Sequence, residues 1–562
     1  MPRTTHAPFT EAARLTLADG RPISRSTVQQ MADQQPRDAS RLAVLWAYYR
    51  NPMRPGALTT GARSYMLAQE CGLPPRILGA WDRRSPAARA IADDRIAGRK
   101  EVVIENDIAW RIQTMVDFMF GRPITIASTA SDPALRQTIE QVLAAIWDSS
   151  GGIALLQDIA LMGHVYGHVD LLVRAAPQTS NPDDMHSDHR SDQPTDEPQT
   201  LGDAVGDSQD ATPRARAASG NARSTSIVER ATNRVRIDLI EPPRGVALLS
   251  DHDYRAIDAY LIRTQRDSRD DASSDAPMLS SAARLAASRI LNWMRSTPPT
   301  DTTSRPASIT TTELFAGPMR QVYETTPDGE TRLIAEEPSL VEARPHDAPP
   351  IVHIQNISQP FEYSGVGEVE PLIPLQDELN TRLSDRANRV TLQSFKMYLA
   401  KGIDGAASMP VAPGTIWTTD NPDAQITAFG ADAASPSEDN HIEQIREAMD
   451  KISAVPPLAS GVVRAKIGNL SSENALRITL LGLMSKTNRK RITYGRGIIG
   501  ASRLILEALH RHGILHTTER DRALRIDWPD PIPRDEQLAL LAAQKKVELG
   551  VPREQVLAEL GY

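Results

Sequence analysis

Residues 351–402 read IVHIQNISQPFEYSGVGEVEPLIPLQDELNTRLSDRANRVTLQSFKMYLAKG, and this stretch decides the fold. The pattern predicts an apolar strand at 349–358, a glycine-containing turn, a long helix over about 366–398 and a closing strand that ends in Lys-Gly. At 1.5 Å per residue the helix would be about 50 Å long. That length is an upper bound, because Pro371 and Pro374 confine the regular helix to later residues.

The predicted helix has two distinct faces. Its apolar stripe consists of Val369, Leu372, Leu379, Leu383, Ala387 and Val390. Its polar face carries Asp377, Asn380, Thr381, Ser384, Asp385 and Asn388. On the same helix Arg382, Arg386 and Arg389 can pair locally with Glu378, Asp385 and Asp377.

The residues before this stretch indicate β structure. Within 308–356 two runs flank Pro-Asp-Gly at 327–329, a strong hairpin signal. Further upstream, 234–250 predicts two strands around a proline-rich turn, and 253–264 predicts a third. A short amphipathic helix is predicted at 279–295.

The N-terminal part begins with a polar arm at 1–40, for which only short helical pieces are expected. The pattern that follows predicts a helix starting near Arg41, a second at 101–120, a strand at 124–128, a third helix from about 132 to 147, and a helix, glycine break and strand within 154–174. Residues 176–226 contain no Phe, Trp, Tyr or Ile. They cannot bury enough apolar area to offset their ordering entropy, so we expect a disordered insertion.

The C-terminal part is mainly helical. A helix is expected at 441–453, and a long helical region from Ser471 to about His512. Gly482, Gly495, Gly497 and Gly500 predict that this region bends or breaks. It contains the most basic cluster of the chain, Lys486, Arg489, Lys490, Arg491 and Arg496. This cluster is interpreted either as a solvated helix face or as a functional patch that faces phosphate or, mainly, pairs with acidic residues of another subunit. Two short helices are expected within 534–562.

Composition excludes several classes of protein. The chain has 562 residues and a formal charge of −8, from 63 basic and 71 acidic residues. Its mass of 61.5 kDa predicts several sub-domains. The single cysteine, Cys71, excludes an internal disulfide and a Cys₄ zinc site. No apolar run is long enough to span a membrane and no signal peptide is evident, so a protein of a reducing compartment is expected.

Catalytic signatures are absent from the sequence. It holds no P-loop, no HExxH, no EF-hand loop and no GxSxG motif. His164 and His168 have the spacing of metal ligands on one helix face, but glycines interrupt that helix and no third ligand is near, so packing is expected. We predict no cofactor and no metal. The acidic balance argues against tight wrapping by nucleic acid.

Three stretches together resemble the portal proteins of tailed bacteriophages. The first is 351–402, described above. The second, VPPLASGVVRAKIGNLSSENALRITLLGLMSKTNRKR at 455–491, is similar to the family's Ser-Gly-x-Ala-Leu helix followed by basic residues, although Glu473-Asn474 stands where the family has glycine. The third is ALLQDIALMGHVYGHVDLLV at 154–173, which is like the family's helix-Gly-strand entry into its wing.

The resemblance implies an α+β, multi-domain portal architecture: a helical wing with small β-sheets, two stem helices, a β-rich clip and a helical crown, forming a ring. The implied domains are a polar N-terminal arm at 1–40, wing at 41–175, the insertion at 176–226, a wing β region at 227–278, stem helix 1 at 279–299, clip at 300–356, stem helix 2 at 357–400, wing with tunnel loop and long kinked helix at 401–499, and crown at 500–562.

The resemblance also implies function and partners. Portal proteins form a homo-oligomeric ring, usually of twelve subunits, at one capsid vertex of the virion. Double-stranded DNA is packaged and ejected through the ring, which is assembled in the host cytoplasm. The expected partners are the terminase large subunit, the major capsid and scaffolding proteins, and head-completion or adaptor proteins; no membrane is expected. Twelve charges of −8 give about −96, which repels DNA phosphates and favours a weakly interacting conduit.

Site residues follow from this picture. The polar face of the 366–398 helix is expected to line or border the channel. The candidates for the channel or for DNA proximity are Arg382, Arg386, Arg389, Lys396 and Lys401. The candidates for the subunit interface are Leu372, Leu379, Leu383, Lys486, Arg489, Lys490 and Arg491.

Two other classes of function remain open from the sequence. One is a capsid-associated enzyme, such as a nuclease or protease, with unrecognised motifs. The other is a non-viral scaffold or adaptor with a long disordered loop. Rings with a central hole would favour the portal, and compact monomers would favour an enzyme.

Overall fold

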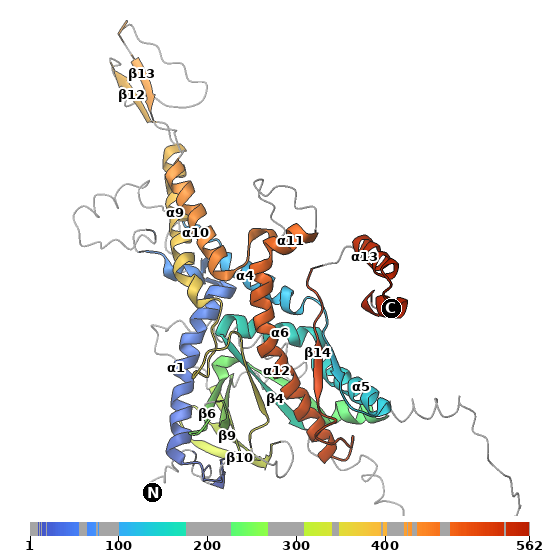
Figure 1. The fold of residues 1–562 in the computed structure, drawn as a ribbon. Helices are drawn as coiled ribbons and strands as arrows, with labels where there is room; N and C mark the ends of the chain where they lie inside the picture. Colours follow the sequence, from blue (N-terminus) through green and yellow to red (C-terminus); the bar gives the residue numbers. More distant parts are fainter. Residues whose placement is uncertain are drawn as a thin grey trace, which may run out of the picture. The chain divides into compact units, whose positions relative to one another are not determined.

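Two antiparallel sheets form the framework of the first of two units into which the chain divides. The computed structural model describes residues 9, 12, 14–17, 20–55, 65–74, 77, 101–175, 226–253, 255–267, 308–339, 348–394, 397–401, 421–423, 425–429, 435–460, 473–532 and 536–560. Unit 1 comprises Met1–Val44, Met115–Gly367 and Asn469–Tyr562; unit 2 comprises Leu45–Thr114 and Glu368–Gly468. The mixture of helix and sheet confirms the α+β class (Figure 1).

The larger sheet of unit 1 has five strands in the order β10-β9-β8-β7-β6. Their bounds are β6 (Gly245–Leu249), β7 (Ile257–Asp267), β8 (Ser308–Ala316), β9 (Met319–Thr325) and β10 (Thr331–Pro338). The predicted turn at 327–329 joins β9 to β10, and Gly329 supplies its positive φ of 84°. Because β7 pairs with β8 from Ala259 to Asp267, strands of the predicted wing β region at 227–278 and of the predicted clip at 300–356 lie in one sheet.

The second sheet has the order β11-β4-β5. Its strands are β4 (His168–Ala175), β5 (Val235–Ile240) and β11 (Ile351–Gln355), and η4 (Pro242–Arg244) follows β5. The helices that share its apolar core are α5 (Pro133–Ser149), α6 (Gly152–Tyr166) and α12 (Leu481–Arg511). A two-stranded sheet of β3 (Thr125–Ser128) and β14 (Leu524–Asp527) adjoins this core. The strand and helix predicted at 124–128 and 132–147 are thereby confirmed.

Gly497 of α12 allows close packing against a neighbouring strand. The helix continues through Gly495, Gly497 and Gly500, so it is not broken at these three glycines. A Cβ at Gly497 would lie 2.3 Å from Cγ1 of Ile354 on β11, which explains the glycine by close approach of the two elements. The break occurs at Leu480, between α11 (Glu473–Thr479) and α12. The predicted wing–crown boundary at 499/500 also falls inside α12.

The described part of the N-terminal arm contains more helix than the short helical pieces that were expected. Helix α1 (Arg25–Arg50) runs through the expected boundary at residue 40 and contains Pro36. In unit 1, Phe9 packs edge-on against Tyr323 of β9 at a centroid distance of 5.0 Å. Together with the buried Val28 and Met31, these contacts place the arm in the core over the five-stranded sheet. Its polar composition concealed a few well-spaced apolar side chains.

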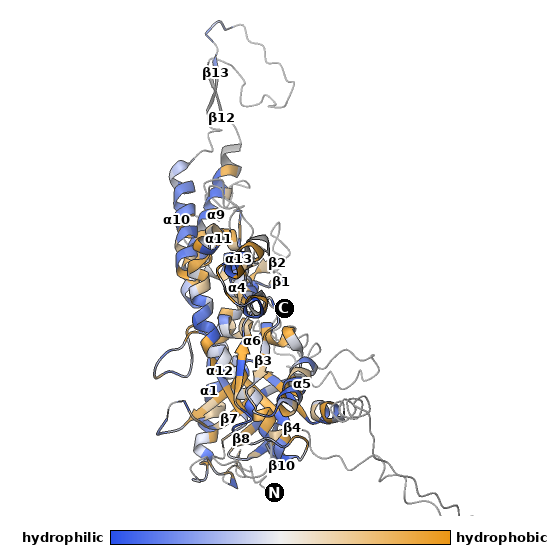
Figure 2. Cartoon of the chain, turned by 45° about the vertical axis from the view of Figure 1, so that its right-hand side comes forward, coloured by the Kyte–Doolittle hydropathy of each residue, from blue (hydrophilic) through white to orange (hydrophobic). Residues whose placement is uncertain are grey.

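Unit 2 is built around the helices α9 (Ile373–Ser394) and α10 (Pro436–Ser453), which lie side by side in Figures 1 and 2. A hairpin of β12 (Met397–Lys401) and β13 (Gln425–Phe429) lies between them in the chain. Figure 2 shows that α10 is mostly hydrophilic on its visible side. The remaining elements of unit 2 are β1 (Met53–Pro55), β2 (Tyr65–Leu67), η2 (Ala68–Gly72), η6 (Glu370–Leu372) and η8 (Pro457–Ser460).

Helix α4 (Asp107–Phe120) begins in unit 2, and the helix predicted over 101–120 is therefore shorter than expected. Residues 101–106 are not helical. The C-terminal helices are α13 (Glu536–Glu548) and α14 (Arg553–Leu560). The predicted helix at 279–295 and residues 176–225 of the predicted insertion lie outside the described residues. In the part of the chain that the structure covers, each helix is too short or too polar to span a bilayer.

Candidate functional site

The three arginines predicted near DNA are all engaged in ion pairs within unit 2. Arg382 pairs with Glu378 at 2.7 Å and with Asp385 at 3.6 Å, which matches the local pairing foreseen from the sequence. Arg386 pairs instead with Asp439 of α10 at 3.2 Å, and Arg389 pairs with Glu438 of α10. The last two pairs connect α9 to α10. Such partly exposed pairs contribute at most about 1 kcal/mol each.

Two lysines were also predicted near the channel or DNA. Lys396 lies outside the described residues. Lys401 is the last residue of β12 and is exposed.

The leucines predicted at a subunit interface belong to the subunit's own core. Leu372 and Leu379 are fully buried within the single chain, so they are not available to a neighbour. Leu383, one turn further along α9, is partly buried. Of the predicted apolar stripe, Val369, Leu372 and Leu379 are buried within the chain, whereas Val390 is 41 % exposed.

The polar face of α9 is also covered, by residues 101–107 of the same unit. Every fourth residue of this face, which we call the polar ladder, is hydrogen-bonded to main chain of that segment. The ladder consists of Gln376, Asn380, Ser384 and Asn388. It accepts hydrogen bonds of 2.7–3.0 Å from the main-chain N–H groups of Asp107, Glu105, Val103 and Glu101, in that order.

The geometry of the ladder follows from the rise per residue of the helix and of the extended segment. Four residues of helix rise about 6.0 Å, and two residues of extended chain rise about 6.6 Å. Alternate residues of 101–107 therefore meet successive turns of α9, in antiparallel order. Asn388 and Gln376 also donate to the main-chain oxygens of Glu101 and Glu105, as a neighbouring strand would. Asn380, Ser384 and Asn388, which belong to the face expected to line or border the channel, are hydrogen-bonded within the chain.

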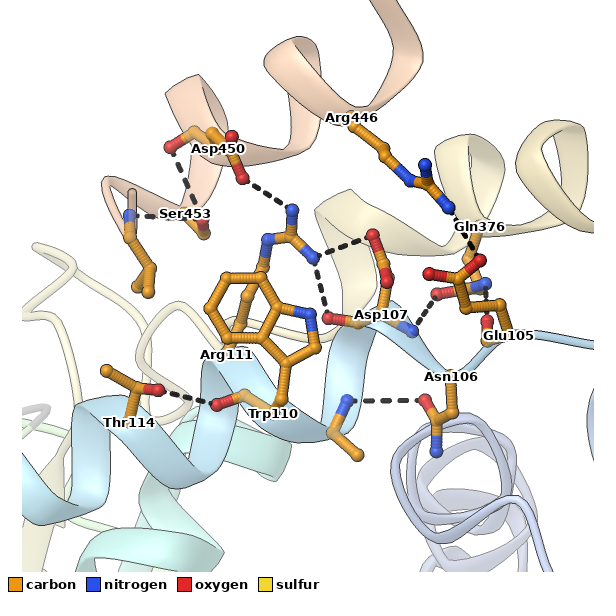
Figure 3. A network of polar contacts seen from close by, with 12 residues as sticks. Glu105, Asn106, Asp107, Trp110, Arg111, Thr114, Gln376, Arg446, Asp450 and Ser453 are labelled. Atoms are coloured by element: carbon orange, nitrogen blue, oxygen red, sulfur yellow. Dashed lines mark hydrogen bonds and ion pairs between the residues drawn. The ribbon is translucent and has the colours of Figure 1, made fainter. Parts of the chain in front are cut away.

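A buried arginine continues this network into α10 (Figure 3). Arg111 is fully buried; one of its amino groups lies 3.1 Å from Asp107, and the other lies 2.5 Å from Asp450. Its guanidinium lies over the Trp110 ring at 4.3 Å. Removing one partner from a buried ion pair costs about 3–5 kcal/mol. Arg111 therefore fixes the start of α4 to the end of α10.

A second ion pair lies beside this arginine. Arg446 of α10 pairs with Glu105 at 2.6 Å (Figure 3). Burial raises the pKa of Glu105, and the charge of Arg446 opposes that shift. Neither Arg111 nor Arg446 stood out in the sequence. The sequence signal for this network was the four-residue spacing of the polar ladder residues on α9.

The basic cluster of α12 separates into buried and exposed members. Lys490 is only 2 % exposed and contacts Sδ of Met115 at 3.5 Å, so its predicted place at a subunit interface is wrong. Arg491 lies over the Trp528 ring at 5.1 Å and donates to the Pro529 carbonyl at 2.9 Å. Lys486 is partly exposed and Arg489 is exposed.

Large apolar side chains, which sequence reasoning did not single out, are exposed near this cluster. Ile478 is 74 % exposed, Leu481 64 % and Ile492 58 %. The exposed Arg489 and Arg496 lie within one turn of Ile492 on α12. An exposed apolar group rimmed by charge is typical of a protein–protein contact.

Two of the stretches noted in the sequence meet at a glycine-lined junction in unit 1. Gly167 ends α6 with a φ of 91° and faces Gly365 so closely that a Cβ on it would lie 2.2 Å from the Gly365 oxygen. Gly367 contacts the same backbone. The glycines of both stretches are thus explained by backbone contact between the end of α6 and the loop after β11.

The two histidines considered as metal ligands lie at the same junction. His164 Nδ1 is 2.6 Å from the Ala160 oxygen, inside α6, and His168 is buried at the start of β4. Among the described residues, no three His, Cys, Asp or Glu side chains are grouped as metal ligands would be.

The described residues define a multi-element α+β subunit whose charged and amide side chains fasten one segment to another. The chain matches the family described as "Phage portal protein, SPP1 Gp6-like" over residues 320–561. This match confirms the resemblance to the portal proteins of tailed phages, a structural rather than enzymatic family found in the virion capsid. It includes the first and second of the three stretches and excludes 154–173. No curated protein matches the chain.

Proposed function

We propose that this chain assembles into a ring, of about twelve subunits, that conducts double-stranded DNA into and out of a phage capsid at one vertex. The observation that carries the proposal is the portal-family match over 320–561, which contains α9, the β12–β13 hairpin, α10 and α12. Oligomeric assembly in the phage head, with DNA, is what this family implies.

The helical pair of unit 2 is our candidate for the stem. The pair expected from the sequence was 279–299 with 366–398, but the first of these lies outside the described residues. In the structure α10 is the helix that packs beside α9, joined to it by the pairs Arg386–Asp439 and Arg389–Glu438. We therefore take α9 and α10 as the two stem helices.

The segment between the stem helices is then our candidate for the clip. In our proposal the docking surface for the packaging motor lies between the two stem helices in the chain. The β12–β13 hairpin lies between α9 and α10 in sequence, so it is our candidate rather than 300–356. Lys401, at the end of β12, is the described basic residue of this segment. The terminase large subunit, and later a head-completion protein, would dock there.

The exposed face of α11 and α12 is our candidate for the contact between subunits. Ile478, Leu481 and Ile492 offer apolar area, and Arg489 offers charge. A chain of net charge −8 presents acidic groups to which a neighbour's arginines can pair. Capsid and scaffolding proteins would contact other surfaces during assembly in the host cytoplasm.

Charge pairing also supports a weakly interacting conduit. Arg382, Arg386 and Arg389 are each neutralised by a carboxylate of the same subunit. Phosphate contacts by unpaired arginines would slow a moving duplex, since each adds salt-dependent affinity. Paired arginines next to an excess of acidic groups avoid that.

The oligomeric state tests the proposal. Light scattering and negative-stain microscopy of the purified chain should give rings with a central hole and a mass near twelve times 61.5 kDa. The matched variants Ile492→Glu on α12 and Ile334→Glu on β10 both place a charge at an exposed isoleucine, and only the first should reduce ring formation. A stable monomer at micromolar concentration would refute the proposal.

A further inference from the structure

A carboxylate in unit 1 is buried among donors from three different segments. Asp170 of β4 is 1 % exposed. It accepts hydrogen bonds from the hydroxyl of Tyr260 on β7 at 2.6 Å and from the hydroxyl of Tyr363, in the loop after β11, at 2.8 Å. Nδ1 of His353 on β11 lies 2.7 Å from its Oδ1. Burial opposes the charge of Asp170, but His353 and the hydrogen bonds lower its pKa, so it is ionised.

The partners of His353 determine its protonation. Its Nδ1 faces the Asp170 carboxylate, and its Nε2 lies 2.7 Å from the main-chain oxygen of Tyr363. Both partner atoms are acceptors only, and a neutral imidazole can donate from just one nitrogen. The two contacts exist together only when His353 is the doubly protonated imidazolium.

These contacts close the loop at 356–367 onto the three-stranded sheet. Tyr363 of the loop makes three contacts with the sheet. Its hydroxyl donates to Asp170, and its main-chain oxygen accepts from His353. Its ring stacks on the imidazole of His353 at a centroid distance of 3.9 Å. Two main-chain bonds lie at the ends of this loop, from the Asn356 N–H to the Gly167 oxygen at 2.8 Å and from the Val366 N–H to the Ile357 oxygen at 3.0 Å.

We propose that His353 is a protonation-dependent latch, whose imidazolium holds the 356–367 loop against β4 and whose deprotonation releases it. Loss of one proton turns a nitrogen lone pair toward either the Asp170 carboxylate or the Tyr363 carbonyl, and each contact then becomes repulsive. The latch is closed at lower pH and opens as pH rises. This inference does not depend on the proposed portal function.

The other charged groups around the latch do not produce the same response. They are His168 on β4, Tyr260 on β7, Tyr363 in the loop and Arg244 in η4, with Asp38 and Arg41 of α1 acting on His168. Burial lowers the pKa of His168 to about 4, so this histidine stays neutral at and above about pH 6. The pKa values of Tyr260 and Tyr363 are raised well above the ordinary value by burial, so both tyrosines stay protonated. These three groups therefore keep the same charge over the pH range in which the latch is tested.

Amide hydrogen exchange of the full chain tests the latch. After correction for the intrinsic pH dependence of exchange, protection of Asn356 and Val366 should fall about tenfold or more between about pH 6 and about pH 9. His353→Gln cannot form an imidazolium, and its protection should be lower at about pH 6 and independent of pH.

Two controls keep the test decisive. His441→Gln removes an exposed histidine of α10 that pairs with Glu378 in unit 2, and the pH response of the loop should remain. His168→Gln removes the other imidazole beside the latch, and the response should also remain. Flat protection in the unmodified chain would overturn the proposal without any variant. So would a pH response that persists in His353→Gln.

Discussion

Helices α9 and α12 both come from stretches that resemble portal proteins, yet they use their faces in opposite ways. Helix α9 buries its polar ladder against residues 101–107 of the same chain. Helix α12 leaves Leu481 and Ile492 exposed while burying Lys490. Polarity along a helix therefore does not say which face meets a partner.

The two helices differ because polar and apolar side chains are stabilised by different surroundings. Amide side chains can satisfy the N–H and C=O groups of an extended segment, so a polar face is a stable place to bury main chain. An exposed apolar face gains nothing until another surface covers it. In this chain the polar ladder of α9 is hydrogen-bonded, whereas Leu481 and Ile492 of α12 are left exposed.

The largest effect should come from putting the same charge on both helices. Leu379→Asp places an uncompensated carboxylate in the core of unit 2 and should cost several kcal/mol, with loss of folded protein. Leu481→Asp, at an exposed position of α12, should leave folding intact and reduce ring formation. Circular dichroism and light scattering measure the two outcomes. A folded but monomeric Leu379→Asp variant would restore α9 to the subunit interface.

A histidine that is buried in its neutral form in unit 1 should make stability fall in mild acid. The pKa of His168 is lowered to about 4 by burial, whereas an unfolded histidine has a pKa of about 6.5. Between these values the unfolded chain binds more protons, so stability falls as pH falls. Urea denaturation should show a loss of about 2 kcal/mol from this group between about pH 7.5 and about pH 5. His168→Gln should lack that loss and His441→Gln should keep it; equal slopes in all three would contradict the assignment.

The stability that the polar ladder contributes should depend on the side chains of α9 and not on the side chains of residues 101–107. Asn380→Leu keeps the side-chain size but leaves the buried Glu105 N–H without its acceptor, a cost of about 1–3 kcal/mol. Val103→Ala changes a segment residue held through its main chain and should cost less than about 0.5 kcal/mol. Thermal unfolding compares the two. Equal losses would show that the segment is recognised by its side chains instead.

The smallest effect is expected at the arginines between α9 and α10. Arg386→Ala and Arg389→Ala each remove a partly exposed ion pair worth at most about 1 kcal/mol. Rings should form, and DNA packaging by assembled rings should be unchanged. Reduced uptake in a packaging assay would instead place these arginines near DNA.

Local signals in the sequence predicted much of the secondary structure. The Pro-Asp-Gly turn, the alternating strands around it and the helix-glycine-strand of 154–174 were all identified, because each depends on neighbours in the chain. Pairing over long distances was not predictable. Strand β7 joins β8 across residues 268–307, and Asn380 meets Glu105 from 275 residues away.

The wrong predictions at the candidate site also arose because contacts between distant parts of the chain could not be predicted. The first part of α1, before the helix start predicted near Arg41, was missed because Pro36 and a polar composition obscured the apolar spacing of Val28 and Met31. Lys490 was assigned to a surface because lysine is usually exposed, and only tertiary packing against Met115 shows otherwise. Amphipathic pattern gave the correct faces of α9 but not their intramolecular partners.

The most direct test of the account is the mass and shape of the assembled chain beside Ile492→Glu. The account predicts rings with a central hole, near twelve times 61.5 kDa, for the unmodified chain, and folded subunits that fail to close rings for the variant. Monomers of 61.5 kDa at micromolar concentration in the unmodified chain, or intact rings in the variant, would contradict it.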